Sequence, residues 1–189
     1  INEPKLIRLL SNHLPHNSQV HIANSMPMRD LEWFWKRGQV DAKLFGNRGV
    51  NGIDGTLGTA MGLAHQSDKP TFLITGELAF LHDSNALLFS TYFKGSLTII
   101  LINNDGGGIF EHLPISQHKA FEKCFATPQS CSFQKLCEAH GIDYKISSSC
   151  KEIIQEIESP LSSGIRLIEI ITDRKENKKF RDDLLAISG

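Results

Sequence analysis

The sequence predicts an α/β domain in which a parallel sheet of about six strands carries helices on both faces. Strand-like and helix-like apolar patterns alternate along most of the 189 residues, which is typical of parallel sheets. The segment LTIILIN (97–103) is almost entirely apolar, as expected of a strand that is covered on both faces. We expect one domain over residues 1–189, without internal repeats or linkers.

The first quarter of the chain begins the alternation. EPKLIRLLSNHL (3–14) is amphipathic, with leucines near one face, and predicts a helix. PMRDLEWFW (27–35) begins with proline, which is favoured in the first turn of a helix. QVHIA (19–23) and AKLFGN (42–47) are expected to be strands.

The pattern continues through the middle of the chain. Asp54 is placed to cap a helix over DGTLGTAMGLAHQ (54–66), whose small residues permit close packing. PTFLITG (70–76) predicts a buried strand, and ELAFLHDSNALLFSTYF (77–93) predicts a helix. The strand LTIILIN follows.

The last third of the chain repeats helix, strand, helix and strand. The segments that predict this order are SFQKLCEAHG (132–141), DYKIS (143–147), KEIIQEIESPL (151–161) and IRLIEIIT (165–172). The charged tail DRKENKKFRDDLLAI (173–187) is expected to form a surface helix with a solvated charged face.

Composition excludes several classes of protein. A formal net charge of -1 gives no strong field toward nucleic acid or a membrane surface. No apolar run reaches the roughly 20 residues that span a bilayer. The four cysteines form no CxxC pair and are expected to be reduced thiols. The chain lacks an initiator Met, so we expect it to be a piece of a longer protein. No targeting segment is visible, so we expect a cytoplasmic location, or a plastid location if the source is a plant or alga.

Polar residues follow two of the predicted strands, in TGELAF (75–80) and NNDGGG (103–108). The carboxyl ends of parallel strands share one edge of a sheet, so Glu77 and Asn104 are expected to converge there. Carboxylate, amide and backbone carbonyl oxygens are the ligands that Mg²⁺ prefers. We expect the glycines to turn backbone N–H groups toward an anion. Taken alone, NNDGGG is equally typical of a flexible turn.

This pattern resembles the diphosphate-binding motif of thiamine diphosphate (TPP) enzymes, in which Gly-Asp-Gly is followed by Asn-Asn. Here the motif stands as GEL (76–78) and NN (103–104). The resemblance implies that Glu77, the Asn104 side chain and the Gly106 carbonyl hold Mg²⁺ or Mn²⁺, which grips the diphosphate. Glutamate replaces the usual aspartate and leucine the usual second glycine, so we expect a preference for Mn²⁺ or weaker metal binding.

Four stretches resemble one family more closely: ANSMPMRD (23–30), GNRGVNGIDG (46–55), GELAFLHDSNALL (76–88) and INNDGGGIFEHLP (102–114). They are similar to the C-terminal domain of the 2-succinyl-5-enolpyruvyl-6-hydroxy-3-cyclohexene-1-carboxylate synthase (MenD) family. That family decarboxylates 2-oxoglutarate on TPP and adds the succinyl-semialdehyde unit to isochorismate, in menaquinone or phylloquinone biosynthesis. The resemblance implies a homodimer or homotetramer for the full-length enzyme.

The resemblance also implies roles for individual residues. Both substrates are carboxylates, which arginine recognises well. The residues that match substrate-contacting positions are Ser25, Arg29, Arg48, Ile109 and Phe110. Those that match cofactor positions are Asn51, Gly52, Ile53, Gly76, Leu78, Asn104, Gly106 and Gly107. Ile53 corresponds to the bulky residue that props the cofactor in its bent conformation. Without the resemblance, both arginines would be interpreted as surface or structural residues.

In TPP enzymes a separate pyrimidine-binding domain supplies the glutamate that activates the cofactor. In this family that domain precedes the one described here, so we expect no catalytic residue in this chain and no activity from the chain alone. Two alternatives remain open. One is another TPP enzyme, of the acetohydroxyacid synthase or ketoacid decarboxylase type. The other is a non-catalytic binding module of the same fold, which only the glutamate at position 77 favours.

Overall fold

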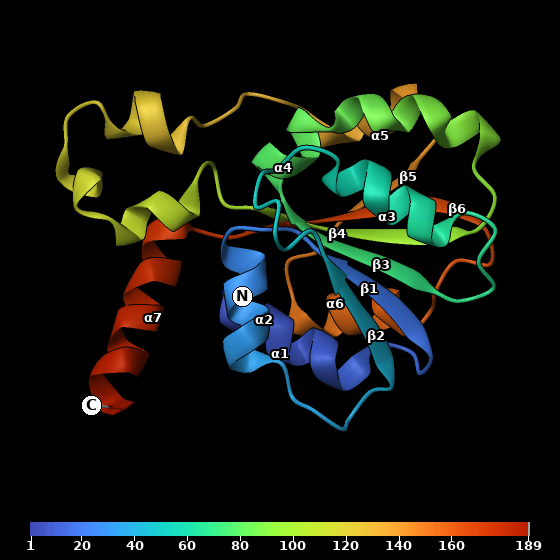
Figure 1. The fold of residues 1–189 in the computed structure, drawn as a ribbon, viewed down its shortest axis with the longest axis horizontal. Coiled ribbons are helices and arrows are strands. Elements are labelled where there is room, and N and C mark those ends of the chain that lie inside the picture. Colours follow the sequence, from blue (N-terminus) through green and yellow to red (C-terminus); the bar gives the residue numbers. More distant parts are fainter. Residues whose placement is uncertain (189) are drawn as a thin grey trace.

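The structure, a computed structural model, describes residues 1–188 and contains one sheet of six strands (Figure 1). The strands are β1 (Ser18–Ile22), β2 (Ala42–Gly46), β3 (Thr71–Gly76), β4 (Ser96–Asn103), β5 (Asp143–Ile146) and β6 (Gly164–Ile171). They lie in the order β2-β1-β3-β4-β6-β5, and every neighbouring pair is parallel. The predicted fold class and strand positions are confirmed.

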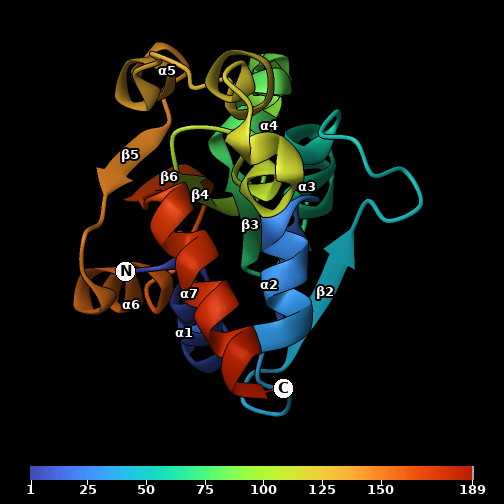
Figure 2. The ribbon, with the colours of Figure 1, turned by 90° about the vertical axis from the view of Figure 1, so that its left-hand side faces the viewer.

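Helices cover both faces of this sheet (Figure 1). On one face lie α1 (Glu3–His13), α2 (Met26–Phe34) and α6 (Cys150–Ile157). On the other face lie α3 (Thr56–Ala64), α4 (Glu77–His82) and α5 (Phe133–Ala139). The last helix, α7 (Arg174–Ser188), approaches α2 at the edge of the domain (Figure 2), and Arg181 of α7 pairs with Asp30 of α2. Within residues 1–188, none of these helices has the length and apolar character needed to cross a bilayer.

The central strand β4 is buried on both faces, as its apolar sequence predicts. Ile100 and Ile102 pack into the cluster beneath α1 and α6, while Ile99 and Leu101 pack into the cluster beneath α3 and α5. Alternate side chains of a strand point to opposite faces, so both layers of helices are anchored on this one strand. After Thr98 the strand is apolar up to Ile102, and it becomes polar at Asn103, where it reaches the carboxyl edge of the sheet.

The predicted cap of α3 and the predicted length of the helix that follows β3 are both wrong, and both differences involve Asp83. Asp54 does not cap α3, because the helix begins at Thr56 and its cap position is taken by Gly55 in the left-handed conformation. The Asp54 carboxylate instead lies 2.9 Å from His82 Nε2. The cap comes from Asp83, whose Oδ2 accepts a hydrogen bond from the Gly58 N–H at 2.8 Å. At this same residue the helix predicted over 77–93 breaks, and the chain continues as a 3₁₀-helix over Ser84–Tyr92.

The charged tail forms the predicted helix α7, but one side of it is not solvated. Arg174, Asn177 and Arg181 recur at the spacing of one helix face, and all three are buried. Arg181 forms ion pairs with Glu3 and Asp30, which lie near the other end of the chain. The helix is therefore docked through polar contacts rather than through an apolar stripe.

Candidate functional site

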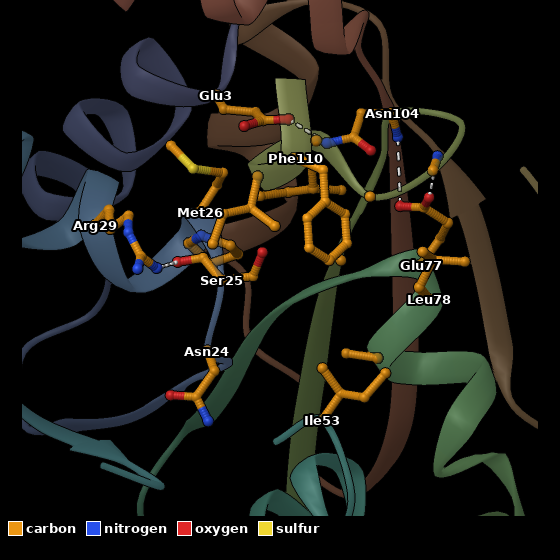
Figure 3. A pocket seen from close by; sticks show the side chains of 18 of the residues that line it. Glu3, Asn24, Ser25, Met26, Arg29, Ile53, Glu77, Leu78, Asn104 and Phe110 are labelled. Carbon is orange, nitrogen blue, oxygen red and sulfur yellow. Dashed lines mark hydrogen bonds between the residues drawn. The ribbon is translucent and has the colours of Figure 1, made fainter. Parts of the chain in front are cut away.

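A cavity of about 380 Å³ lies at the carboxyl ends of β1, β3 and β4 (Figure 3). Strands β1 and β3 are neighbours from which the chain proceeds to opposite sides of the sheet, and such switch points are where open α/β sheets bind ligands. Its lining includes the predicted residues Ser25, Arg29, Arg48, Asn51, Ile53, Gly76, Glu77, Leu78, Asn104, Gly106, Gly107, Ile109 and Phe110. Gly52 is outside the lining, and its carbonyl accepts a hydrogen bond from Asn24 Nδ2 at 2.9 Å.

Glu77 places a buried carboxylate at the first residue of α4. Its Oε1 accepts a hydrogen bond from the Gly106 backbone N–H at 2.6 Å, and its Oε2 accepts one from the Asn104 backbone N–H at 3.5 Å. Burial raises the pKa of this carboxyl to about 7, although the backbone N–H groups act in the opposite direction and the nearby Glu3 raises it further. A buried carboxylate that is held only by backbone donors is suited to a cation.

Asn104 and Gly106 supply two further oxygens beside this carboxylate. The Asn104 Nδ2 group donates to Glu3 Oε1 at 2.6 Å, whereas its Oδ1 is buried and has no hydrogen-bond partner in the part of the chain that is described. Buried polar atoms normally have partners, so an unpaired oxygen here indicates a ligand. The Gly106 carbonyl accepts from the Gly108 N–H at 2.9 Å and keeps a second lone pair.

These three oxygens fit Mg²⁺ or Mn²⁺, which bind carboxylate, amide and carbonyl oxygens and retain water or phosphate at other positions. Residues 1–188 contain no cluster of three or more His, Cys, Asp or Glu side chains that is suited to a metal. A cation here would therefore depend on this mixed set, with one carboxylate as its only anionic protein ligand.

The expectation that the glycine N–H groups face an anion is wrong. The Gly106 N–H donates to Glu77, the Gly107 N–H to the Ala126 carbonyl at 2.7 Å, and the Gly108 N–H to the Gly106 carbonyl. All three donors are thus used within the protein. Glycine is required at position 106 because a Cβ there would lie 2.4 Å from the Ala126 carbonyl oxygen.

The opposite side of the cavity is organised by Asn24, which is buried. Its Nδ2 group hydrogen-bonds carbonyls of the 47–52 loop, and its Oδ1 accepts from Arg48 Nη1 at 3.3 Å. Arg29 Nη1 donates to the Ser25 carbonyl at 2.9 Å. A guanidinium carries five N–H donors, so both arginines retain donors for a carboxylate in the cavity.

Apolar residues complete the lining. Ile53, Leu78, Ile109 and Phe110 are half-buried at the cavity, and the Phe110 ring packs edge-on against Phe125. Side chains of this kind exclude water and hold the apolar part of a ligand.

Sequence reasoning missed Glu3, which also lines the cavity. An acidic residue in the first turn of a helix is common for local reasons, so no signal in the sequence separates Glu3 from an ordinary helix-start residue. Its contact with Asn104 joins residues 101 positions apart and becomes visible only in the fold.

In the absence of a cation, the protein is expected to lose stability as the pH rises from about 4.5 to about 7, because Glu77 titrates in this window. Over this range the folded state holds a proton that the unfolded state has released, so the free energy of unfolding falls as the pH rises. The fall is on the order of 3 kcal/mol. Urea denaturation with a chelator, near pH 5 and near pH 8, measures it.

Glu77→Gln is the control for this pH dependence, because it keeps an oxygen that can accept from Gly106 but does not titrate. Asp30, whose pKa burial raises to about 6, contributes equally to both proteins. An identical loss of stability in the wild type and in Glu77→Gln would show that the Glu77 pKa is not raised.

Comparison with known proteins agrees with this geometry. The family model of the thiamine pyrophosphate enzyme C-terminal TPP binding domain matches residues 33–170. The 2-succinyl-5-enolpyruvyl-6-hydroxy-3-cyclohexene-1-carboxylate synthase of Synechococcus elongatus is 48% identical over 187 residues, which are 98% of this chain and 32% of that protein. The synthase of the same name from Trichodesmium erythraeum is 49% identical over 187 residues, again 98% of this chain and 32% of that protein.

A third relative of that name, from Synechocystis, is 46% identical over 184 residues, 97% of this chain and 31% of that protein. The chain thus spans about a third of the length of the curated relatives that it matches. The family model covers well over half of the chain, including the residues around the cavity from Arg48 to Phe110. The chain belongs to the family of C-terminal TPP-binding domains of thiamine pyrophosphate enzymes.

Proposed function

We propose that this chain is the diphosphate- and metal-binding domain of a TPP-dependent synthase that decarboxylates 2-oxoglutarate and adds the succinyl-semialdehyde unit to isochorismate. The proposal includes a preceding pyrimidine-binding domain that supplies the activating glutamate, and a homodimer or homotetramer as the assembled enzyme. A location in the cytoplasm, or in a plastid of a plant or alga, stays a prediction, as does the end product.

The observation that carries the proposal is that one cavity is lined both by arginines and by a cluster of oxygens suited to a cation. Arg29 and Arg48 lie on one side, and the Glu77 carboxylate with the unpaired Asn104 oxygen lies on the other. The first pair suits substrates that are carboxylates, and the second suits a cation that carries a diphosphate. Identity of 48% over 98% of the chain to a synthase of this name supports the same assignment.

In this proposal Glu77, Asn104 Oδ1 and the Gly106 carbonyl hold Mg²⁺ or Mn²⁺, and the cation binds the cofactor's diphosphate. Bound TPP supplies the electron sink for decarboxylation and carbon–carbon bond formation. Ile53 would support the bound cofactor in its bent conformation, with Asn51, Gly76, Leu78 and Gly107 as further cofactor contacts. Gly52 would act only through the loop, which its carbonyl ties to Asn24.

The remaining predicted site residues act on the substrates. Arg29 and Arg48 orient the substrate carboxylates, with Ser25 as a further hydrogen-bonding group. Ile109 and Phe110 form an apolar wall that excludes water.

The test is turnover by the full-length protein that carries this domain, with TPP and Mg²⁺ present. Isochorismate with 2-oxoglutarate should yield the carboligated product, pyruvate should be a poor donor, and this chain alone should be inactive. A preference for pyruvate would favour an acetohydroxyacid synthase or ketoacid decarboxylase instead. Absence of both TPP binding and turnover in the full-length protein would favour the non-catalytic module.

Arg29→Ala is expected to raise KM for an acidic substrate of the full-length protein roughly 10- to 100-fold. The change removes a charge-assisted hydrogen bond worth about 1.5–3 kcal/mol. Steady-state kinetics with each substrate varied in turn identifies which carboxylate Arg29 serves. Arg37→Ala is the matched control, because Arg37 is exposed and outside the cavity lining. Equal kinetics for the Arg29 and Arg37 variants would contradict the assignment.

A further inference from the structure

Glu3 connects the N-terminal helix to the metal motif. Its side chain is 2% exposed, and both of its oxygens are used. Oε1 accepts from Asn104 Nδ2 at 2.6 Å and from Thr172 Oγ1 at 3.3 Å, while Oε2 accepts from Arg181 Nη2 at 2.6 Å. Figure 3 shows the Asn104 amide between Glu3 and Glu77, with its nitrogen toward Glu3.

The position of this carboxylate is fixed from several directions. Arg181 is held in turn by Asp30, whose Oδ1 accepts from Arg181 Nε at 2.8 Å and whose Oδ2 accepts from Nη2. The Glu3 backbone N–H donates to Asn177 Oδ1 at 3.0 Å. Residues of α1, α2 and α7 thus form one buried polar cluster behind the cavity.

The chemistry of this contact determines which way the Asn104 amide points. A carboxylate has only acceptors, whereas an amide presents donors at nitrogen and acceptors at oxygen. Asn104 must therefore give its NH₂ group to Glu3, and its oxygen must lie on the other side. That oxygen is the buried atom that lacks a partner among the described residues.

We infer that Glu3 is a positioning residue that fixes the orientation of the Asn104 amide, so that Oδ1 faces a divalent cation beside Glu77. The inference rests on the proposed function for the presence of that cation. If the Asn104 amide were reversed, its two N–H donors would point at the cation position and would repel the cation. Arg181 and Asp30 act one step further away, by holding Glu3.

The test is a titration of the full-length protein with Mn²⁺ in the presence of TPP. The electron paramagnetic resonance signal of free Mn²⁺ measures how much of the metal is bound. In Glu3→Gln the side-chain oxygen is required by Arg181, so the new NH₂ group faces Asn104 and turns its amide over. Mn²⁺ affinity should fall about 10- to 100-fold, the usual effect of losing a group that orients a metal ligand. Glu111→Gln is the matched control. Glu111 is also buried and also pairs with an arginine, Arg174, but neither residue lines the cavity.

Asn104→Asp provides a rescue that a merely structural role would not produce. Alone, it sets two carboxylates against each other where Glu3 and Asn104 now lie 2.6 Å apart, and Mn²⁺ binding should weaken. Combined with Glu3→Gln, the new carboxylate can accept from Gln at one oxygen and offer the other to the cation. The double variant should therefore recover most of the wild-type affinity.

A second measurement needs no metal and no substituted protein. In the wild-type chain, the Asn104 side-chain NH₂ should exchange its hydrogens slowly in NMR, because it donates to a buried carboxylate. Fast exchange would overturn the inference, even if Glu3→Gln failed to fold. Unchanged Mn²⁺ affinity in Glu3→Gln would also overturn it and would leave the proposed function intact. Failure of the wild type to bind Mn²⁺ would instead remove the proposed function and the inference with it.

Discussion

Replacing Glu77 by alanine is expected to abolish the metal-dependent part of TPP binding to the full-length protein. Among the three proposed ligands, Glu77 supplies the only carboxylate. Because Glu77 is buried, water cannot replace its negative charge beside the cation. Loss of a group that merely orients a metal ligand costs about 10- to 100-fold in affinity, so loss of the ligand itself should cost about 100-fold or more. Calorimetric titration of TPP, with and without Mg²⁺, measures the difference.

Asp105→Asn is the matched control for this substitution. Asp105 lies between the other two proposed ligands, Asn104 and Gly106, but its side chain is 75% exposed and it is outside the cavity lining. Asparagine tolerates the positive φ of 61° at this position as well as aspartate does. Metal-dependent binding should survive in Asp105→Asn. Its survival in Glu77→Ala would exclude Glu77 as a metal ligand.

Gly106→Ala is expected to cost about 3 kcal/mol or more of unfolding free energy, because strain and overpacking each contribute roughly 1–3 kcal/mol. The new Cβ would lie 2.4 Å from the Ala126 carbonyl oxygen, and φ at this residue is +133°. The loop would have to move away from Ala126 and carry the Gly106 carbonyl with it. Urea denaturation of the metal-free chain measures the stability, and TPP titration measures the effect on the site.

Gly62→Ala is the control for the effect of an added methyl group. Gly62 lies within α3, where a Cβ would meet nothing within 4 Å. Alanine in a helix interior is more stable than glycine by roughly 0.5–1 kcal/mol, so this variant should gain stability. A loss of less than about 1 kcal/mol in Gly106→Ala would mean that the loop is not fixed by its packing on Ala126.

The parts of the fold that the sequence predicts well depend on local patterns. The buried strand β4 and the polar residues at its end can be recognised because apolar side chains give way abruptly to asparagine and glycine. The meeting of Glu77 with Asn104 follows from strand order alone, since β3 and β4 are parallel neighbours. Only the resemblance to a known family predicts that Arg29 and Arg48 belong to the site, because no local pattern distinguishes them from surface residues.

The wrong predictions depend on contacts between distant segments. Asp83 looks like an ordinary helix residue, but it caps α3 from 25 positions away, and the helix that contains it breaks there. The charged face of α7 looks solvated because the partners of Arg181 lie 151 and 178 positions earlier. The sequence predicts glycine N–H groups that face an anion, whereas the Gly107 N–H donates to the Ala126 carbonyl. In each case a polar group of the side chain or backbone is bonded to a partner that only the fold brings near.

The polar spacing within α7 does not by itself identify the buried face. Arg174, Asn177 and Arg181 recur with the period of one helix face. A stripe of this kind is usually interpreted as solvated, because burying charge is costly unless it is paired. Here the pairing exists, and it connects the last helix to Glu3 and so to the metal motif.

The most direct test of the central claim is a crystal structure of the protein with Mn²⁺ and TPP, with the metal located by its anomalous scattering. The geometry described here predicts one strong peak bounded by the Glu77 carboxylate, Asn104 Oδ1 and the Gly106 carbonyl, with the diphosphate on the cavity side of the metal. A peak elsewhere, or bound TPP whose diphosphate does not approach these three oxygens, would contradict it.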